Sequence, residues 1–167
     1  MTDALAAHVL EDAVVQFQTL KKMADRAIAQ VDDEQFFTVL DPESNSIAII
    51  VKHIAGNQRS RWTEFLNSDG EKPDRNRDAE FETDNKATRE DLLRRWEEGW
   101  ACLWEAVRPL EPRDLMRTVK IRGEDYTVLM AINRQLTHYA AHIGQIVFLA
   151  KHFRSGEWRT LSIPRAR

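Results

Sequence analysis

Four long segments of the chain carry apolar residues at helical spacing. The first, residues 4–31, contains neither glycine nor proline. A second runs over residues 46–66, a third from a cap at Thr88 to Pro109, and a fourth from residue 127 or 128 to Phe153. Apolar residues that recur three or four positions apart form one face of an amphipathic helix. The pattern predicts an all-α four-helix bundle that spans residues 1–167 as one domain.

The connections between these segments differ in character. Residues 34–45 contain a break at Asp41-Pro42, because proline restrains the residue before it. Residues 69–87 form an aperiodic loop that would span about 60 Å if fully extended, which allows the second and third helices to run in parallel. Before the fourth helix, residues 118–121 alternate, residues 122–125 can turn and residues 126–128 can return, so we expect a short β-hairpin.

Composition limits the function. The chain has 167 residues, a formal net charge of -3 and one cysteine, Cys102. A net negative charge does not suit a nucleic-acid partner, because duplex binding needs a concentrated basic face. We expect no membrane span, since no apolar run approaches the length a bilayer requires. The lone cysteine and the lack of an export-signal pattern at the N-terminus favour the cytoplasm, and small-molecule chemistry is the starting hypothesis.

Three histidines are candidate metal ligands. His138 and His142 stand four residues apart in the fourth helix, so both imidazoles leave the same face. His53 lies in the equally apolar second helix. Imidazole binds zinc, nickel, copper and iron, and three histidines from two facing helices would leave a coordination position open for water or substrate. His8 lies near the start of the first helix, where we expect it to be exposed.

Other interpretations of these residues fit less well. A zinc protease would need glutamate directly after His138, and a di-iron carboxylate bundle would need glutamate three residues before each helical histidine; the sequence has neither. Trp96, Trp100 and Trp104 form a stripe that is more typical of a core or subunit interface than of a ligand cage. Cys102 lacks a basic activator and is expected to be a small core residue rather than a nucleophile.

Polar side chains accompany the histidines on both helices. Asn57 and Arg61 follow His53 on one stripe of the second helix, and Gln135 and Gln145 flank the pair in the fourth. Such groups orient metal ligands or substrate, so these four residues are the candidate substrate-binding residues. Arg59, Arg61 or Arg77 is a candidate to hold an anionic group of the substrate. For charged residues on a helix, a solvated surface is an equally good interpretation.

The histidine pattern is similar to a known superfamily. His53 in a mid-chain helix and the His138/His142 pair in the last helix resemble the DinB/YfiT-like superfamily of metal-dependent enzymes. Longer motifs resemble its uncharacterised DUF1572 branch. They are residues 46–57 (SIAIIVKHIAGN), 59–66 (RSRWTEFL), 69–73 (DGEKP), 77–78 (RD) and 134–147 (RQLTHYAAHIGQIV). The resemblance covers nearly the whole chain.

The resemblance carries expectations of its own. It implies an up-down-down-up four-helix bundle, a site in which His53, His138 and His142 hold nickel, zinc or a similar divalent ion, a homodimer and a bacterial origin. Relatives in the superfamily use low-molecular-weight thiols, which suggests a thiol-dependent S-transferase, or a hydrolase, acting on a small molecule. The alternative is a non-catalytic bundle that binds a metal or ligand and acts through a protein partner. An open metal position in a cavity would favour the enzyme.

Overall fold

The structure is a computed structural model that describes residues 2–82 and 86–163, and these residues are mostly helical. Within them are five α-helices, three short 3-10 helices and one two-stranded antiparallel sheet. The elements in chain order are α1 (Asp3–Ile28), α2 (Asp33–Phe37), α3 (Ile47–Trp62), η1 (Asp78–Phe81), α4 (Arg89–Val107), η2 (Pro112–Asp114), β1 (Thr118–Ile121), β2 (Glu124–Thr127), α5 (Val128–Arg154) and η3 (Ser155–Glu157).

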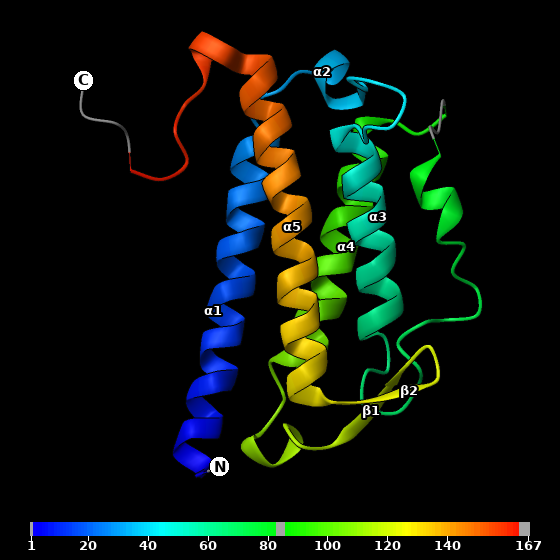
Figure 1. Cartoon of the computed structure of the whole chain (residues 1–167), viewed down its shortest axis with the longest axis vertical. Coiled ribbons are helices and arrows are strands. Elements are labelled where there is room, and N and C mark those ends of the chain that lie inside the picture. The colour runs from blue at the N-terminus through cyan, green and yellow to red at the C-terminus, as the bar shows by residue number, and fades with distance from the viewer. Residues whose placement is uncertain (1, 83–85, 164–167) are drawn as a thin grey trace.

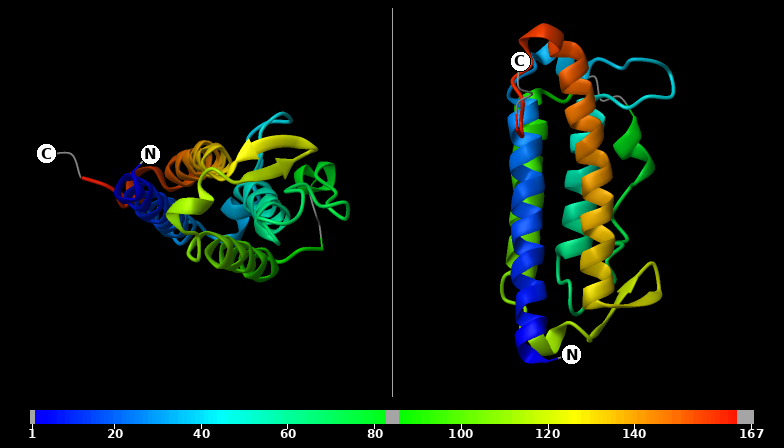
Figure 2. Two further views of the ribbon diagram at one scale, coloured as in Figure 1. Left: turned by 90° about the horizontal axis from the view of Figure 1, so that it is seen from below. Right: turned by 60° about the vertical axis from the view of Figure 1, so that its left-hand side comes forward.

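The four long helices lie side by side along the long axis of the molecule (Figures 1 and 2). In Figure 1, α1 and α5 run in one direction, and α3 and α4 run in the opposite direction. Because α3 and α4 are parallel, the chain between them must return along the whole length of α3. Residues 63–82 and 86–88 belong to this return, and η1 within them packs against α3 (Figure 1). The expected long second connection is therefore present.

Side-chain caps begin the helices where the sequence predicted them. The Ser46 side chain accepts a hydrogen bond from the Ile49 backbone N–H at the start of α3. Thr88 does the same for Asp91 in α4, and Thr127 for Met130 in α5. Each cap satisfies one backbone donor that the first helical turn leaves without a partner. These caps define where α3 and α5, which carry the three histidines, begin.

Several boundaries differ from the sequence prediction. Helix α1 ends at Ile28 rather than near residue 31, because Asp32 forms a capping box with Gln35 and starts the unpredicted short helix α2. Helix α3 ends at Trp62 rather than near residue 66. Thr63 is extended, and Glu64 has a positive φ of 49°, a conformation that cannot continue a helix.

The predicted hairpin is present, with a tighter turn. Arg122 and Gly123 both have positive φ angles, 57° and 78°, as a two-residue type I′ turn requires. Ile121 therefore pairs with Glu124, and β2 begins at Glu124 instead of Tyr126. The hairpin leads directly into α5, so it determines where along the long axis of the molecule α5 begins (Figure 1).

Aromatic side chains fill the core between the four long helices. Phe17, Trp62, Trp96, Trp100 and Tyr139 are among the largest fully buried side chains. The Trp62 Nε1–H donates to the Tyr139 hydroxyl at 3.1 Å, and that hydroxyl donates to Asn57 Oδ1 at 3.0 Å. Buried polar atoms need such partners. These two hydrogen bonds join α3 to α5 next to the histidines.

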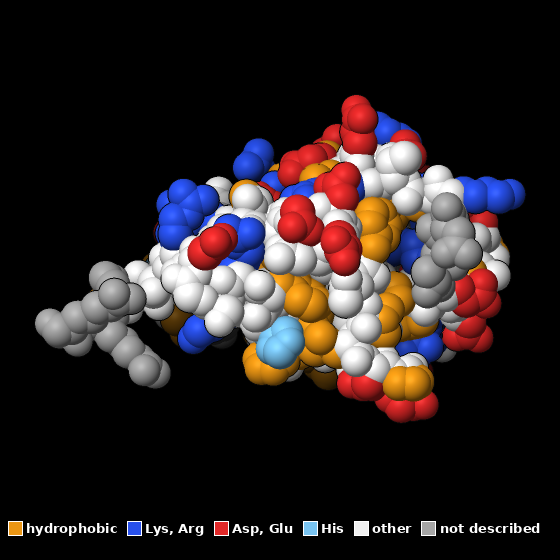
Figure 3. Space-filling model, turned by 90° about the horizontal axis from the view of Figure 1, so that it is seen from above, with side chains coloured by type: hydrophobic (Ala, Val, Ile, Leu, Met, Phe, Trp, Pro, Cys, Tyr) orange, Lys and Arg blue, Asp and Glu red, His pale blue; other side chains and the backbone are white. Residues whose placement is uncertain are grey.

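One end of the molecule exposes hydrophobic side chains among charged ones, as Figure 3 shows. Leu40, after α2, and Phe148, on α5, are exposed and line a pocket of about 470 Å³ together with Gln145. None of the described helices combines the length and apolar character that a membrane span needs.

Candidate metal centre

His53 is held rigidly on α3. Its side chain is 3% exposed, and its Nδ1 lies 2.8 Å from Glu80 Oε2 on η1. The Phe81 ring packs on the imidazole with 4.5 Å between ring centroids. Because Glu80 can only accept a hydrogen bond, His53 carries its proton on Nδ1 and presents the lone pair of Nε2. The loop between α3 and α4 therefore orients a histidine of α3.

The two histidines of α5 have a matching arrangement. His138 Nδ1 lies 3.4 Å from Gln135 Oε1, and His142 Nδ1 lies 3.0 Å from Gln145 Oε1. Both glutamines are three residues from their histidine along the helix, a spacing that places the side chains together. An amide oxygen accepts from Nδ1–H, which leaves Nε2 free on each ring. All three histidines thus use Nδ1 for an oxygen acceptor and keep Nε2 for another partner.

The three imidazole rings lie close together. Each offers a ring nitrogen, and these nitrogens all lie within 4.8 Å of one another. The Nε2 atoms of His53 and His138 are 3.2 Å apart. Zinc–nitrogen bonds of about 2.0–2.1 Å place two imidazole nitrogens about 3.3 Å apart on a tetrahedral ion. Two unprotonated nitrogens face each other at a distance that suits a shared cation, so the donor set fits a divalent metal ion such as zinc or nickel.

Burial keeps the imidazoles of α5 neutral. Burial, followed by the neighbouring His142 and His53, lowers the pKa of His138 to about 3. The pKa of His142 is also lowered, chiefly by burial, although its hydrogen bond to Gln145 acts in the opposite direction. Neutral imidazole is the form that binds metal. Both pKa shifts therefore favour the neutral form that can coordinate an ion.

Glu80 is the functional residue that the sequence did not indicate. Its carboxylate accepts from His53 and also from Arg75, whose Nε and Nη2 each lie 2.8 Å from a Glu80 oxygen. Burial alone would raise the pKa of Glu80, but the hydrogen bonds and charges of Arg75 and His53 lower it below its usual value. The carboxylate therefore stays ionised. Carboxylate partners of this kind fix the orientation of a metal-binding histidine and raise its basicity.

Gly56 makes room for this carboxylate. A Cβ atom at Gly56 would lie 2.3 Å from Glu80 Oε1, which is far inside van der Waals contact. Glycine is required at this position of α3 so that Glu80 can reach His53, which lies one turn earlier. Gly56 belongs to the sequence motif of residues 46–57 that also contains His53.

A pocket of about 730 Å³ opens beside the histidines. All three histidines line it, as do the predicted residues Asn57, Arg61 and Gln135. Gln145 lies outside this lining and contacts His142 Nδ1 instead. The lining includes five arginines, which are Arg61, Arg75, Arg77, Arg122 and Arg134. Five cationic side chains therefore line the same pocket as the histidines, four of them in ion pairs with carboxylates.

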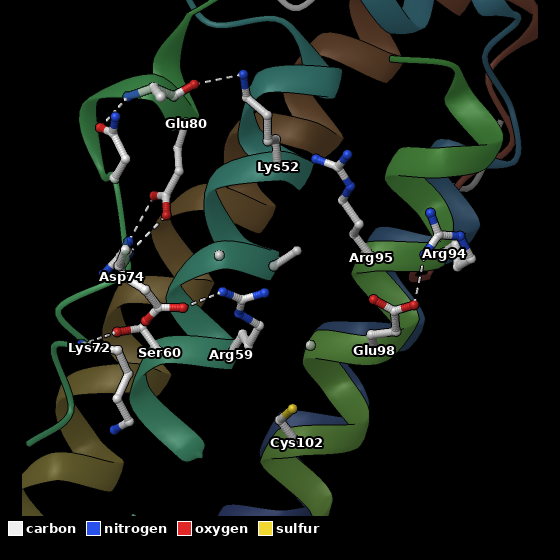
Figure 4. A pocket seen from close by; sticks show the side chains of 16 residues that line it. Lys52, Arg59, Ser60, Lys72, Asp74, Glu80, Arg94, Arg95, Glu98 and Cys102 are labelled. Carbon is white, nitrogen blue, oxygen red and sulfur yellow. Dashed lines mark hydrogen bonds and ion pairs between the residues drawn. The ribbon is translucent and has the colours of Figure 1, made fainter. Parts of the chain in front are cut away.

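Two residues considered from the sequence lie elsewhere. His8 is exposed in the first turns of α1, as expected. Arg59 faces the opposite side of α3, where its Nη2 pairs with Asp74 at 2.9 Å. That side holds a second pocket of about 670 Å³ between α3, α4 and the loop, and Figure 4 shows its lining. Cys102 lies at one end of it, half-buried against the core.

Comparison with known proteins identifies a family. No curated protein and no solved structure gave a significant match to the chain. A family model described as a protein of unknown function, DUF1572, matches residues 4–167, which is nearly the whole chain. The matched region includes His53, His138 and His142. The chain therefore belongs to the DUF1572 family.

Proposed function

We propose that this protein is a metal-dependent enzyme in which His53, His138 and His142 hold one divalent ion. The arrangement of the Nδ1 atoms carries the proposal. Each Nδ1 faces an oxygen acceptor, on Glu80, Gln135 or Gln145. Three imidazoles that turn the same nitrogen outward and the other toward a common point are typical of metal sites with supporting hydrogen bonds. The Nε2 atoms of His53 and His138 face each other at 3.2 Å, and a ring nitrogen of each of the three histidines lies within 4.8 Å of the others, an arrangement that a shared cation would explain.

The protein's own residues have distinct parts in this proposal. The three histidines would hold the ion, and three protein ligands are fewer than a divalent ion usually takes, so a substrate or water could bind it as well. A divalent ion supplies a Lewis acid that lowers the pKa of water or a thiol and so provides a nucleophile near neutral pH. Asn57 and Gln135 line the pocket next to the histidines and would orient a substrate. Gln145 would act only through His142.

The pocket favours the enzyme over the alternative, a non-catalytic bundle that binds metal or a small ligand and acts through a partner. A purely structural ion is saturated by protein ligands. Here the histidine cluster lines a pocket of about 730 Å³, a size typical of small-molecule sites. A substrate atom therefore has room to approach the ion, so we propose a small-molecule substrate and a nickel or zinc ion.

The finer features rest on the resemblance to the DinB-like superfamily. We propose that α1, α3, α4 and α5 form a single-domain, up-down-down-up four-helix bundle of that type. The directions of the helices in Figure 1 support this arrangement. We further propose that the protein is a thiol-dependent S-transferase or a hydrolase, that it forms a homodimer, and that it belongs to the cytoplasm of a bacterium. None of these proposals depends on which metal is bound.

Elemental analysis tests the metal site. Protein purified without an affinity tag or chelator should carry about one divalent ion per chain. A triple substitution of His53, His138 and His142 to alanine should lose the ion while its helical circular dichroism persists. The matched control replaces His8 and His152, which are both exposed, and should keep the ion. Native protein that holds no metal above background after reconstitution with nickel and with zinc would overturn the proposal.

A further inference from the structure

Arg61 is a buried cation whose hydrogen-bonding capacity is unused. The side chain is 3% exposed and lines the same pocket as the three histidines. Its Nε and Nη1 are buried and have no hydrogen-bond partner in the part of the chain that the structure describes. Among the described residues, the carboxylate that pairs with it is Glu71, at a long 3.9 Å from Nη2. A buried guanidinium without partners is costly, so its retention calls for an explanation.

The nearby carboxylates are committed to other groups. Glu71 is shared with Arg75 at 3.1 Å and with Arg122 at 3.4 Å, both closer than Arg61. Asp69 accepts hydrogen bonds from the backbone N–H groups of Glu71, Arg122 and Gly123. Glu71 is thus shared among three arginines, and Asp69 acts on Arg61 through its charge without a direct ion pair among the described residues. The positive charge on this side of the pocket is therefore incompletely compensated.

A second arginine adds to this charge. Arg134 lies on α5 one turn before His138, and it lines the same pocket. Its guanidinium sits over the Tyr126 ring at 5.6 Å, and the described residues give it no ion pair. Burial is the main cause that lowers the pKa of Arg61; Tyr139 and Glu71 act in the opposite direction, and the charges of Arg134 and Arg75 lower it further. Arg134 is exposed, and its charge acts against the charged form of buried Arg61 in the pocket that both residues line; a bound anion would offset that effect.

The position of Arg61 is built into the fold. A Cβ atom at Gly70 would lie 2.4 Å from Arg61 Nη1, so the loop passes directly against the guanidinium. The Gly70 backbone is itself held by two hydrogen bonds. Its N–H donates to Lys120 O at 2.8 Å, and its C=O accepts from Ser60 Oγ at 3.1 Å. The loop and the hairpin therefore enclose the head group of Arg61 instead of letting it turn to solvent.

We propose that Arg61 and Arg134 form an oxyanion subsite, which binds a carboxylate or phosphate group of the substrate. The inference rests on the proposed function, because it names the class of molecule that the metal centre acts on. His53 and Arg61 are eight residues apart on α3, or about 12 Å along the helix axis. Arg134 is one turn from His138, so the subsite lies one to two helical turns from the histidines, and the substrate would place its reacting group at the histidines and its anionic group at the two arginines.

Anion titration of metal-free protein tests the subsite without the metal. The probes are inorganic phosphate and acetate, added to chelator-treated protein at constant ionic strength, with binding measured by calorimetry and by the shift in unfolding temperature. At least one anion should bind the native protein, and the preferred anion distinguishes a phosphate from a carboxylate substrate. Arg61→Gln and Arg134→Gln should each weaken binding about tenfold or more, as expected for a charged hydrogen-bond partner.

The control is Arg95→Gln. Arg95 is exposed on α4 in the other pocket (Figure 4) and should leave anion binding unchanged. Arg61→Lys is a second variant that keeps the charge but loses the planar fork, and it should bind more weakly than the native protein. The subsite proposal is overturned by native protein that binds neither anion, by an Arg61→Gln variant that binds as well as native, or by an equal loss in Arg95→Gln.

Metal content separates this test from that of the proposed function. Arg61→Gln should retain the metal ion, because Arg61 is not a ligand. A protein that binds phosphate or acetate through Arg61 but never holds metal would overturn the metal-dependent enzyme and leave an anion-binding pocket. A protein that holds metal but binds neither anion would overturn the subsite alone.

Discussion

The Nδ1 of His53 lies 2.8 Å from Glu80 Oε2, and both residues are buried. Glu80 comes from the loop and His53 from α3, so this contact ties the conformation of the loop to the orientation of a candidate metal ligand. Arg75 holds the same carboxylate through two hydrogen bonds. This contact adds to those of Lys52 and Gly70 in holding the loop against α3.

Glu80→Gln should weaken metal binding about 10- to 100-fold, the usual effect of removing a partner of a metal-binding histidine. The neutral amide is a weaker hydrogen-bond acceptor for the His53 Nδ1–H. Arg75 also loses one of its two carboxylate partners and keeps Glu71. Chelator competition measures the affinity. Glu98→Gln, on the exposed face of α4, is the control and should bind metal as the native protein does. Equal affinity in Glu80→Gln would show that Glu80 serves the loop and not the metal.

Gly56→Ala should disrupt the same contact by steric means. The new Cβ would meet Glu80 Oε1 at 2.3 Å, so the carboxylate must move away from His53. We expect a loss of about 1–3 kcal/mol in the free energy of unfolding, as for overpacked sites, together with weaker metal binding. Urea denaturation and chelator competition measure the two effects.

Gly144→Ala is the matched control for Gly56→Ala. It is also a helical glycine, and a Cβ there meets nothing within 4 Å. Alanine is the better helix former, so this variant should be neutral or more stable by up to about 1 kcal/mol. If both glycine variants lost the same stability, the close approach of Glu80 would not be the cause.

The helices and the histidine cluster could be predicted because they depend on local pattern. Apolar spacing and capping residues define α1, α3, α4 and α5, and a four-residue spacing places His138 and His142 on one face. The facing of α3 and α5 follows from their apolar stripes, which brings His53 to the same place. The family match over residues 4–167 agrees with the motifs that the sequence displayed.

Glu80 could not be predicted, because tertiary contacts set the path of its loop. Residues 69–87 have no apolar period, and acids and bases of both signs are dense there. The loop is attached to α3 by Lys52, whose Nζ donates to the carbonyls of Ala79 and Glu82. A lysine on a helix gives no sign of which backbone carbonyls it will reach. Sequence pattern likewise could not tell which side of α3 Arg59 would face.

Acid should destabilise the metal-free protein partly through His138. Its pKa is about 3 in the folded state, against the ordinary histidine value of 6.5. Between these two pH values, His138 binds a proton in the unfolded chain but not in the folded chain. Above pH 6.5 both states are neutral and His138 contributes nothing. As the pH falls from about 6.5 toward 3, the free energy of unfolding decreases.

Urea denaturation in chelator at pH 7 and pH 5 measures this effect. The native protein should lose on the order of 1 kcal/mol more than His138→Ala over that interval, after allowance for solvent screening of a half-buried ring. Carboxylates contribute equally to both proteins and cancel in the comparison. An equal loss in the two proteins would mean that His138 takes up a proton in the folded state as readily as in the unfolded one.

Arg61→Met should make the anion-free protein more stable, although it removes a proposed substrate contact. The guanidinium is buried with Nε and Nη1 unpartnered, so folding takes a charge from water without full compensation. Methionine keeps most of the aliphatic stem and removes the charge. We expect a gain of about 1 kcal/mol or more in the free energy of unfolding, measured by urea denaturation in chloride buffer. Added phosphate or acetate should narrow the difference, because only the native protein gains from the anion.

A less stable Arg61→Met variant in chloride would instead mean that the contacts of the Arg61 head group with the loop at Gly70 outweigh its desolvation, and that the charge is held for structure. Residues kept for function at a cost in stability are common in binding sites. The sign of this one difference in the free energy of unfolding therefore separates a ligand anchor from a structural arginine.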